Sequence, residues 1–489
     1  MKGMTIEKIA ASCGGVLNAP DFPRDAEIGA FVTDSRQAAA GGAYAAIKGA
    51  RVDGHSFIED VYEKGVLLCV GEQDYTPPEG KAYIRVEDTV KALGLIAHEY
   101  MKHLGIPVVG VTGSVGKTST KEVIASVLSV KFKTGKTRGN HNNDIGLPLT
   151  CLELDGDTQI AVLEMGISAP GEMDYLTQVV QPTVGVITNI GVAHMEILGS
   201  RDGIFEEKSK ILKNLPEDGL AVLCGDDDKL PAVKEAAGKK PVFFGLEQNG
   251  LNDLYAADIE ELGLDGTEFT IMGLEGYDGG VRVTMPIPGK HMVLNALAAV
   301  ATGRHFGLDA GQIKEGLSKA ATIAGRTDIS VNKARQIHII DDSYNASPAS
   351  MKSSIDTLSL AKGRRICVLG NMYELGEGSE QMHYDVGRYA ADKGVNVLFT
   401  CGDLAKDIAR GALNVGMHAD IDACAEDECV EIMMTDPGAN VIPEFYIFDD
   451  KDELIEKLSE VVRPGDAVLI KASNSMGFSG IVDAIKNLV

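Results

Sequence analysis

The amino-acid sequence predicts an α/β protein built from three domains. With 489 residues the chain is too long for one ordinary hydrophobic core, so about two to four domains are expected. Short apolar runs punctuated by Gly and Pro predict a small mixed α/β domain over residues 1–103. Strands then alternate with helices, which predicts a central parallel-sheet domain of the P-loop type over 104–325 and a C-terminal doubly wound, Rossmann-like domain over 326–489.

The central region opens with a strand, a loop and a helix. Residues 106–111 are apolar, and Val123, Val127 and Val130 then recur at helical spacing. The remaining elements of this region are three apolar strands of a parallel sheet, an antiparallel meander and a closing helix, at 160–166, 184–190, 221–224, 252–288 and 292–307.

The third region repeats the alternation of strand and helix. Its predicted strands are five apolar runs, at 336–343, 365–371, 396–402, 445–450 and 467–473. The segment between the last two runs, 452–462, has a helical pattern. Such alternation is typical of a sheet with helices on both faces.

Charge and composition exclude several partners. The chain has 46 basic and 71 acidic residues, a net charge of −25, which repels nucleic acid and anionic lipid. No apolar run approaches the roughly 18 residues of a membrane helix, and charges at Lys2, Glu7 and Lys8 interrupt any signal-peptide core. Eight scattered cysteines form no Cys-x-x-Cys pair, so disulfides are not expected. We therefore expect a cytoplasmic protein without membrane insertion.

Residues 110–120, "GVTGSVGKTST", nearly match the phosphate-binding loop G-x-x-x-x-G-K-[ST], but Val111 replaces its first glycine. The physical requirements of such a loop are nevertheless met. Gly113 and Gly116 allow a tight turn, Lys117 can reach outer phosphates, and Thr118 can bind a metal at the start of a helix. The alternative is a glycine-rich turn that merely precedes a helix.

A second Gly-Lys-Thr, at 135–137, is expected to be a decoy. It has no upstream glycine at the loop spacing. The residues that follow, "TRGNHNN", are a poor start for a helix. We therefore expect only the first segment to hold a nucleotide phosphate.

The form T-G-[ST]-x-G-K-[ST], here residues 112–118, resembles the loop of the Mur ligases and their folylpolyglutamate synthetase relatives. Seven further segments resemble the Mur ligase family in order, at 33–65, 139–150, 163–173, 188–200, 206–212, 340–351 and 368–376. The chain is most similar to the branch that joins D-alanyl-D-alanine to UDP-N-acetylmuramoyl-tripeptide in peptidoglycan precursor synthesis. The resemblance implies an ATP-dependent ligase that forms a peptide bond through an acyl phosphate, acts as a monomer, and binds the UDP-sugar, ATP and the dipeptide in its first, second and third domains.

The resemblance also implies the site residues. The catalytic residues are Lys117, Glu164, His194 and Lys208. Two Mg²⁺ ions are held by Thr118, Glu164, His194 and Lys208, the last as a carbamate. ATP is bound by Gly113, Ser114, Val115, Gly116, Lys117, Thr118, Ser119, Asn295, Arg326 and Asp342. The other substrates are bound by Ser35, Arg36, Asn140, Asn142, Asn143, Tyr344 and Asn345.

Several of these residues have a plain structural alternative. Glu164 could cap a helix or form a salt bridge, since acids at strand ends are also structural. A loop histidine such as His194 is more often a surface residue, and Arg326 could form an ordinary interdomain salt bridge. Lys208 could be an exposed lysine paired with a neighbouring glutamate, Glu206 or Glu207.

The sequence departs from the family pattern at five positions: Met292 and Ser347 stand where Asn is usual, Asn371 where Asp is common, Ala472 for Gly and Asn474 for Arg. The last two lie where the incoming dipeptide is expected, so its identity is less defined than the ligase activity.

Three other functions stay open. A sibling ligase that adds one amino acid would carry an Asx-Pro-Arg or Asp-Asp-Ala-Arg motif, which the sequence lacks. A catalytically silent nucleotide-binding module would be expected to lose Lys117, Glu164 or Lys208, and all three are present. A GTPase switch would need Asn-Lys-x-Asp, but residues 331–335 end in arginine.

Overall fold

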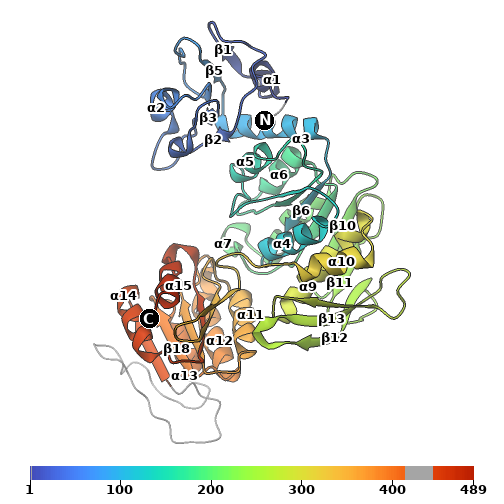
Figure 1. Ribbon diagram of the computed structural model, residues 1–489, viewed down its shortest axis with the longest axis vertical. Coiled ribbons are helices and arrows are strands. Elements are labelled where there is room, and N and C mark those ends of the chain that lie inside the picture. The colour runs from blue at the N-terminus through green and yellow to red at the C-terminus, as the bar shows by residue number, and fades with distance from the viewer. Residues whose placement is uncertain (2, 414–443, 489) are drawn as a thin grey trace, which may run out of the picture.

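The computed structural model describes residues 1, 3–413 and 444–488, and within them it contains three β-sheets of five, nine and six strands (Figure 1). Each sheet is flanked by helices, which confirms the predicted α/β fold in three parts. Cys424 and Cys429 lie outside the described residues. Among the described helices, none is both long and apolar enough to cross a membrane.

The five-stranded sheet lies at one end of the elongated molecule, with strand order β1-β5-β4-β3-β2. Only β1 is antiparallel to its neighbour. Its strands are β1 (Val16–Asn18), β2 (Phe31–Val32), β3 (Ala43–Ala45), β4 (Leu68–Gly71) and β5 (Ala82–Arg85), with helices α1 (Ile6–Ser12) and α2 (Ile58–Glu63).

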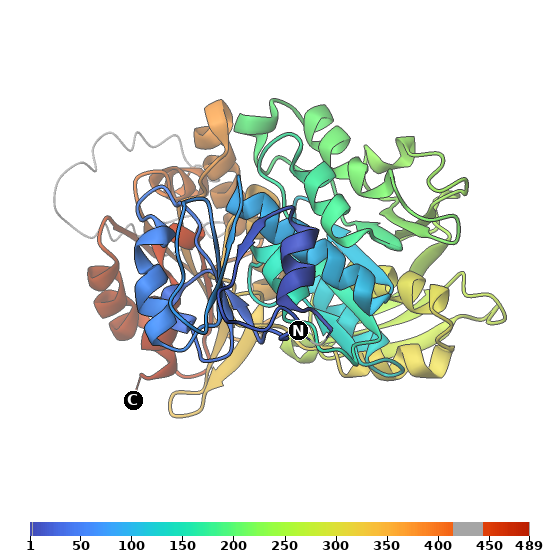
Figure 2. The same ribbon diagram turned by 90° about the horizontal axis from the view of Figure 1, so that it is seen from above.

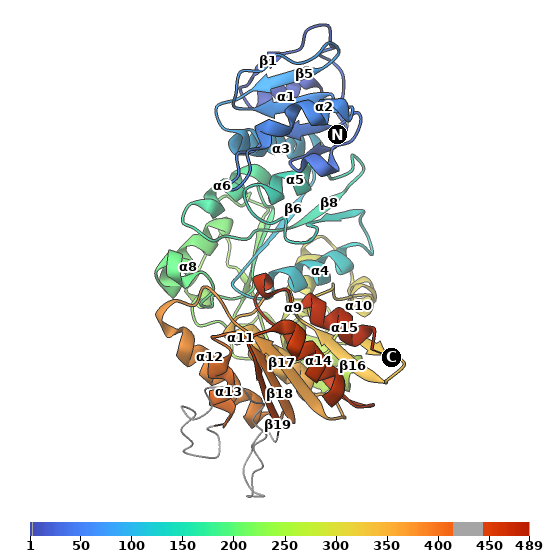
Figure 3. The same ribbon diagram turned by 90° about the vertical axis from the view of Figure 1, so that its left-hand side faces the viewer.

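Helix α3 (Thr89–Leu104) joins the first sheet to the central one. The side chain of Asp88 caps its start by accepting from the backbone N–H of Lys91 at 3.0 Å, and Gly105 ends it in the left-handed conformation, with φ of 59°. The helix packs against α5 (Gly146–Leu152) and α6 (Glu172–Val180) of the central region (Figure 3).

The nine-stranded sheet forms the middle of the molecule, with order β14-β13-β12-β11-β10-β9-β6-β8-β7. In chain order, its strands are β6 (Val108–Thr112), β7 (Thr134–Lys136), β8 (Ile160–Glu164), β9 (Val184–Ile187), β10 (Leu220–Cys224), β11 (Val242–Gly245), β12 (Leu254–Glu261), β13 (Thr267–Met272) and β14 (Val281–Met285). Strands β12, β13 and β14 form the expected antiparallel meander. The Gly-Lys-Thr decoy begins in edge strand β7, not in a phosphate loop.

Strand β6 lies between β8 and β9 and runs parallel to both, so the carboxyl ends of all three strands meet at one edge. In such sheets ligands bind beyond the carboxyl ends, at the strand where the order reverses. Helix α4 (Lys117–Leu128) starts directly after β6 and packs against α9 (Lys290–His305) and α10 (Ala310–Ser318). Helices α7 (Met195–Leu198) and α8 (Arg201–Ser209) follow β9.

The six-stranded sheet has order β15-β16-β20-β17-β18-β19 and is parallel except for β15. Its strands are β15 (Asp328–Asn332), β16 (Ile337–Asp341), β17 (Arg365–Gly370), β18 (Val397–Cys401), β19 (Glu444–Phe448) and β20 (Ala467–Lys471). Edge strand β15 was not expected from the sequence. Figure 2 shows this sheet and the five-stranded sheet on the same side of the central region when the molecule is viewed from above.

Both faces of the six-stranded sheet are covered. Cys367 and Leu369 of β17 pack on one side with helices α11 (Pro348–Ser359), α12 (Ser379–Asp392) and α13 (Lys406–Leu413). Ile366 and Val368 pack on the other side with α14 (Lys451–Val461) and α15 (Ser479–Lys486) (Figure 3). Alternate residues of one strand are therefore buried in separate cores, which explains the continuous apolar runs and confirms the doubly wound arrangement.

Candidate active site

The loop between β6 and α4 has the backbone that a phosphate-binding turn requires. Gly113 has φ of 147°, and a Cβ atom at this position would lie 1.9 Å from the hydroxyl oxygen of Thr188. Gly116, with φ of 83°, precedes α4, and no side chain caps the first turn of that helix. The uncapped N–H groups at the start of α4, together with the helix dipole, suit an anion.

The loop that follows β9 braces the phosphate loop. The backbone N–H groups of Ser114 and Val115 donate to the carbonyl oxygen and to Oδ1 of Asn189, each over 3.0 Å. Thr188 Oγ1 donates to the carbonyl oxygen of Val115 over 2.6 Å, and the N–H of Gly191 donates to Ser114 Oγ over 2.8 Å. These bonds hold the turn in shape from the neighbouring strand.

Lys117 lies over the loop, where its Nζ donates to the carbonyl oxygen of Gly113 over 2.8 Å. Burial lowers the pKa of this amine, while the negative charge of Glu164 raises it and the positive charge of Arg326 lowers it. A phosphate can replace the carbonyl as the partner of Nζ by a small movement of a flexible side chain. The geometry therefore supports the phosphate-binding interpretation over a plain glycine-rich turn.

Glu164 ends β8 and is almost fully buried, with 1% of its surface exposed. Its Oε2 accepts from Thr118 Oγ1 and its Oε1 from Asn142 Nδ2, both over 2.8 Å. Its backbone N–H donates to Thr137 Oγ1 over 2.9 Å, so the decoy segment helps to hold this acid. Among the described residues Glu164 neither caps a helix nor forms a salt bridge; it is hydrogen-bonded to the hydroxyl of Thr118 in the first turn of α4. Two oxygen donors at the end of a phosphate loop fit the preference of Mg²⁺.

His194 is partly buried and precedes α7 with a left-handed backbone, φ of 62°. Its Nδ1 lies 3.0 Å from Oε2 of Glu374, which belongs to the loop after β17. Burial lowers the pKa of His194, Glu374 raises it, and the positive charges of Lys117 and Lys208 lower it further. The predicted ligand therefore lies among the predicted catalytic lysines and in contact with the third part of the molecule.

Lys208 of α8 is buried, with 1% of its surface exposed, and it is not the exposed lysine of the structural alternative. Burial lowers its pKa well below the usual 10.5, and the charge of Lys117 lowers it further. Glu207 is engaged elsewhere: its Oε1 accepts from the backbone N–H of Gly171 over 2.9 Å and its Oε2 from Lys210 Nζ over 2.6 Å. The amine of Lys208 is therefore held in a low-polarity site next to a second cation.

The guanidinium of Arg326 stacks on the ring of Tyr344, with 3.9 Å between its Cζ and the ring centroid. Asn140 contributes a side-chain hydrogen bond to the same tyrosine. Nε of Arg326 is buried and forms no hydrogen bond within the described structure. Predicted residues from the central and third regions thus meet at one place.

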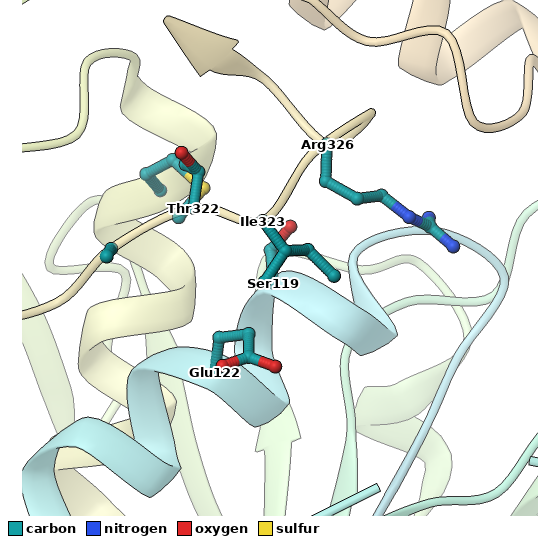
Figure 4. A pocket seen from close by; sticks show the side chains of 7 residues that line it. Ser119, Glu122, Thr322, Ile323 and Arg326 are labelled. Atoms are coloured by element: carbon teal, nitrogen blue, oxygen red, sulfur yellow. The ribbon is translucent and has the colours of Figure 1, made fainter. Parts of the chain in front are cut away.

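A narrow pocket separates α4 from the segment that leads to Arg326 (Figure 4). Figure 4 shows Ser119 and Glu122 on α4 opposite Thr322, Ile323 and Arg326. The pocket therefore lies beside the first two turns of α4, next to the phosphate loop.

Besides Ser114 and Val115, two further predicted ATP ligands form hydrogen bonds within the fold. Asn295 accepts from Thr120 Oγ1 over 2.9 Å and donates from Nδ2 to Met292 Sδ over 3.2 Å, so its amide ties α9 to α4. Asp342 accepts from the backbone N–H of Thr327 over 3.0 Å and pairs with the buried ammonium of Lys471. Both side chains hold elements together here, and their contacts with a nucleotide stay predictions.

The predicted substrate residues are placed differently from one another. Asn142 donates a hydrogen bond to Glu164, and the ring of Tyr344 stacks against the guanidinium of Arg326. Asn143 Oδ1 accepts from the N–H of Gly146 over 2.8 Å near the start of α5, and Asn345 Oδ1 accepts from the N–H of the next residue. Ser35 and Arg36 lie on the turn after β2, where Arg36 pairs with Asp34 at 2.7 Å and is largely exposed.

Three residues at the site were not singled out from the sequence: Asn189, Glu374 and Lys471. The sequence positions of two of them could have indicated a role at the site. Asn189 closely follows β9 and Lys471 ends β20, so both lie at the carboxyl edge of a parallel sheet, where ligands bind. Glu374 carries no such signal, because its partner His194 is distant in sequence.

Comparison with known proteins agrees with this geometry. Residues 27–101, 111–303 and 325–474 match three family descriptions: "Mur ligase family, catalytic domain", "Mur ligase middle domain" and "Mur ligase, glutamate ligase domain".

Relatives match over nearly the whole chain. The UDP-N-acetylmuramoyl-tripeptide–D-alanyl-D-alanine ligase of Bacillus subtilis is 38% identical over 481 residues, covering 98% of this chain and 97% of the relative. A crystal structure of MurF from Acinetobacter baumannii superimposes with a TM-score of 0.84 at 30% identity, covering 99% of this chain and 98% of that one. MurF from Thermotoga maritima in complex with ADP gives a TM-score of 0.75 at 28% identity, with 94% and 97% covered. The phosphate loop, the acid behind it and these full-length matches lead to one conclusion: the chain belongs to the Mur ligase family.

Proposed function

We propose that this protein is an ATP-dependent ligase that joins D-alanyl-D-alanine to UDP-N-acetylmuramoyl-tripeptide, a step of peptidoglycan precursor synthesis. The observation that carries the proposal is the hydrogen bond of Thr118 to Glu164 at the end of an intact phosphate loop. Full-length similarity to ligases of that name supports the choice of substrates.

The reaction needs a carboxylate to become reactive toward an amine. Transfer of the γ-phosphoryl group of ATP to the carboxylate gives an acyl phosphate, whose leaving group is phosphate. The amine of the dipeptide then attacks the acyl carbon, the tetrahedral adduct collapses, and a peptide bond, phosphate and a proton are released. The two anionic reactants repel each other, so their charge must be covered by Lys117 and by cations.

The residues present fit magnesium. Thr118 and Glu164 offer oxygen ligands next to the phosphate loop. His194 lies close enough to Lys117 and Lys208 for their charges to lower its pKa. Bound Mg²⁺ would neutralise charge on the phosphates and the carboxylate. Lys117 would bind the outer phosphates, while the hydrogen bonds to Asn189 would hold the loop in the shape that presents the uncapped N–H groups at the start of α4 to them.

We assign Lys208 as a carbamate. Its lowered pKa leaves a larger share of the amine neutral, and a neutral amine adds CO₂ to give a carbamate and a proton. The product carries a negative charge in place of a positive one, which removes the repulsion by Lys117 and supplies an oxygen ligand. Arg326 and Tyr344 would then contact the phosphates or the substrate from the third domain.

Each of the three expected domains would bind one substrate. Residues 1–103 would bind the UDP-sugar, 104–325 ATP, and 326–489 the dipeptide, at the carboxyl edge of the six-stranded sheet. We place the reaction in the cytoplasm, because ATP is its energy source and the six described cysteines are all free thiols.

The experiment that tests the proposal compares acceptors. Purified protein receives UDP-N-acetylmuramoyl-tripeptide, ATP and Mg²⁺, and phosphate release is followed with D-alanyl-D-alanine or with single amino acids. Release that depends on the dipeptide supports the proposal. Release with a single amino acid would transfer the protein to a sibling activity of the family, and no release with any acceptor would reject the ligase assignment.

A further inference from the structure

One contact joins the site across two domains: Oε2 of Glu374 lies 3.0 Å from Nδ1 of His194. His194 comes from the loop after β9 of the central sheet, and Glu374 comes from the loop after β17 of the six-stranded sheet. The side chain of His194 is about three-quarters buried, with 26% exposed, whereas that of Glu374 is 63% exposed. The acid therefore reaches the histidine from the solvent side of the interface.

Both residues have a left-handed backbone, with φ of 62° at His194 and 64° at Glu374. This conformation is unfavourable for residues with a Cβ atom, and it persists only where the surroundings impose it. Such residues gather at functional sites. Here two of them face each other, one from each domain.

The segment that carries Glu374 is held by hydrogen bonds from two other elements. The N–H of Met372 donates to Nε2 of the buried His383 in α12 over 2.9 Å. The N–H of Tyr373 donates to Ser473 Oγ, just after β20, over 3.0 Å. The backbone before Glu374 is therefore fixed, and its carboxylate is directed toward the central domain.

The contact leaves one ring nitrogen of His194 available. With Nδ1 occupied by the carboxylate, only Nε2 can bind a metal. A carboxylate on the far nitrogen is the usual partner of a metal-binding histidine, because it sets the tautomer and the ring orientation and makes the ligating nitrogen more basic.

We infer that Glu374 is a positioning residue for the metal-binding histidine, so that the second metal site of the ligase is completed only when the six-stranded domain docks on the central one. This inference rests on the proposed function, because it needs a metal at His194. Glu374 lies outside the predicted set of ligands. Its contact with His194 would make the affinity of the second metal site depend on the docking of the two domains. Since the pair is partly exposed, it contributes little to folding, and its effect belongs in metal affinity.

The test counts metal ions on the full-length protein without turnover. Mn²⁺ is titrated, with electron paramagnetic resonance as the readout, in the presence of UDP-N-acetylmuramoyl-tripeptide and a non-hydrolysable ATP analogue. The wild-type protein should bind two Mn²⁺ ions. Glu374→Ala should weaken one site about tenfold and leave the other within about twofold, and Glu374→Gln, which keeps an acceptor oxygen, should fall between.

Two controls separate positioning from a general loss of charge or of fold. Glu377→Ala removes an equal charge from an exposed neighbour and should change neither site. In a His194→Ala background, Glu374→Ala should have no additional effect on Mn²⁺ binding, because it acts through the histidine.

The outcomes distinguish this inference from the proposed function. Two wild-type sites that Glu374→Ala leaves unchanged would overturn the inference and leave the ligase assignment standing. A single wild-type site would also overturn it. A wild-type protein that binds no Mn²⁺ with nucleotide would count against the proposed function itself.

Discussion

The hydroxyl of Thr118 donates to Oε2 of Glu164 over 2.8 Å, which links the first turn of α4 to the carboxyl end of β8. The two residues come from neighbouring strand–loop units of one parallel sheet. Their oxygens lie together because β6 and β8 end at the same edge, so the fold itself brings two oxygen atoms together beside the phosphate loop.

Replacing Thr118 tests this pair. Thr118→Val keeps the shape of a side chain that is 2% exposed but removes the hydroxyl, so product formation should fall by about 10²-fold and require more Mg²⁺. Thr118→Ser keeps the hydroxyl and should retain most of the activity. Steady-state rates measured against Mg²⁺ concentration check both variants, and equal rates for Val and Ser would exclude a metal-binding role.

Lys117→Ala should abolish product formation, with a loss of at least about 10³-fold, because the cation nearest the outer phosphates is removed. The matched control is Lys213→Ala, which truncates an exposed lysine of the same domain and should behave as wild type. Phosphate release and product can be measured together by chromatography. Substantial turnover in Lys117→Ala would mean that another group carries the phosphate charge.

Lys208→Ala should also be inactive, but for a different reason that added reagents can reveal. A short carboxylate such as formate or acetate can occupy the space of a missing carbamate, so it should restore part of the activity of Lys208→Ala. The same reagents should not restore Lys117→Ala. Wild-type turnover in Lys208→Ala without any addition would disprove the carbamate.

The ion pair of Lys471 with Asp342 predicts an effect on stability. Both residues are buried, and Lys471 Nζ also donates to the carbonyl oxygen of Asn345 over 2.9 Å. Lys471→Met leaves a buried carboxylate without its cation and should lower the free energy of unfolding by about 3 kcal/mol or more. The double variant Lys471→Met/Asp342→Asn should recover part of that loss. Urea unfolding measures both, and an unchanged midpoint in the single variant would contradict the prediction.

His383 predicts a pH dependence of stability. Its Nε2 accepts from the N–H of Met372 and burial lowers its pKa below the usual 6.5, so the folded protein holds it neutral. Below pH 6.5 the unfolded chain binds a proton that the folded chain does not, so stability rises with pH through this window and falls on acidification.

Below pH 6.5, His383 should make the free energy of unfolding rise with pH by up to about 1.4 kcal/mol per pH unit. His383→Gln should be less stable than wild type at pH 7 but should lose less stability between pH 7 and pH 5. Thermal unfolding of the two proteins at several pH values isolates this histidine from the others. Parallel curves would show that His383 does not titrate with unfolding.

Features encoded in adjacent residues were predictable from the sequence. The phosphate loop, Glu164 at a strand end and the apolar strands of both large sheets are visible as local patterns. Strands β7 and β15 were missed because they are edge strands whose exposed positions interrupt an apolar run. The interior strand β11 (Val242–Gly245) was missed as well, because four residues are too few to show a pattern of their own. The second Gly-Lys-Thr was expected not to form a phosphate loop, and its glycine and lysine lie in edge strand β7.

Contacts between distant segments were not predictable in the same way. Nothing near Asn189 indicates that its side chain accepts from the phosphate loop, because that bond depends on β9 lying beside β6. Nothing in the sequence near Asp342 indicates that it will form an ion pair with Lys471, because β16 and β20 become neighbours only in the folded sheet. The resemblance to a family supplied residues, and the three-dimensional structure supplied their partners.

The most direct test follows oxygen from the substrate carboxylate. UDP-N-acetylmuramoyl-tripeptide labelled with ¹⁸O in its reacting carboxylate is incubated with ATP, Mg²⁺ and D-alanyl-D-alanine, and the released phosphate is analysed by mass spectrometry. If the terminal phosphoryl group passes to the carboxylate, each phosphate released should carry one ¹⁸O atom. Phosphate without ¹⁸O, formed together with the peptide product, would show that no acyl phosphate forms and would contradict the account.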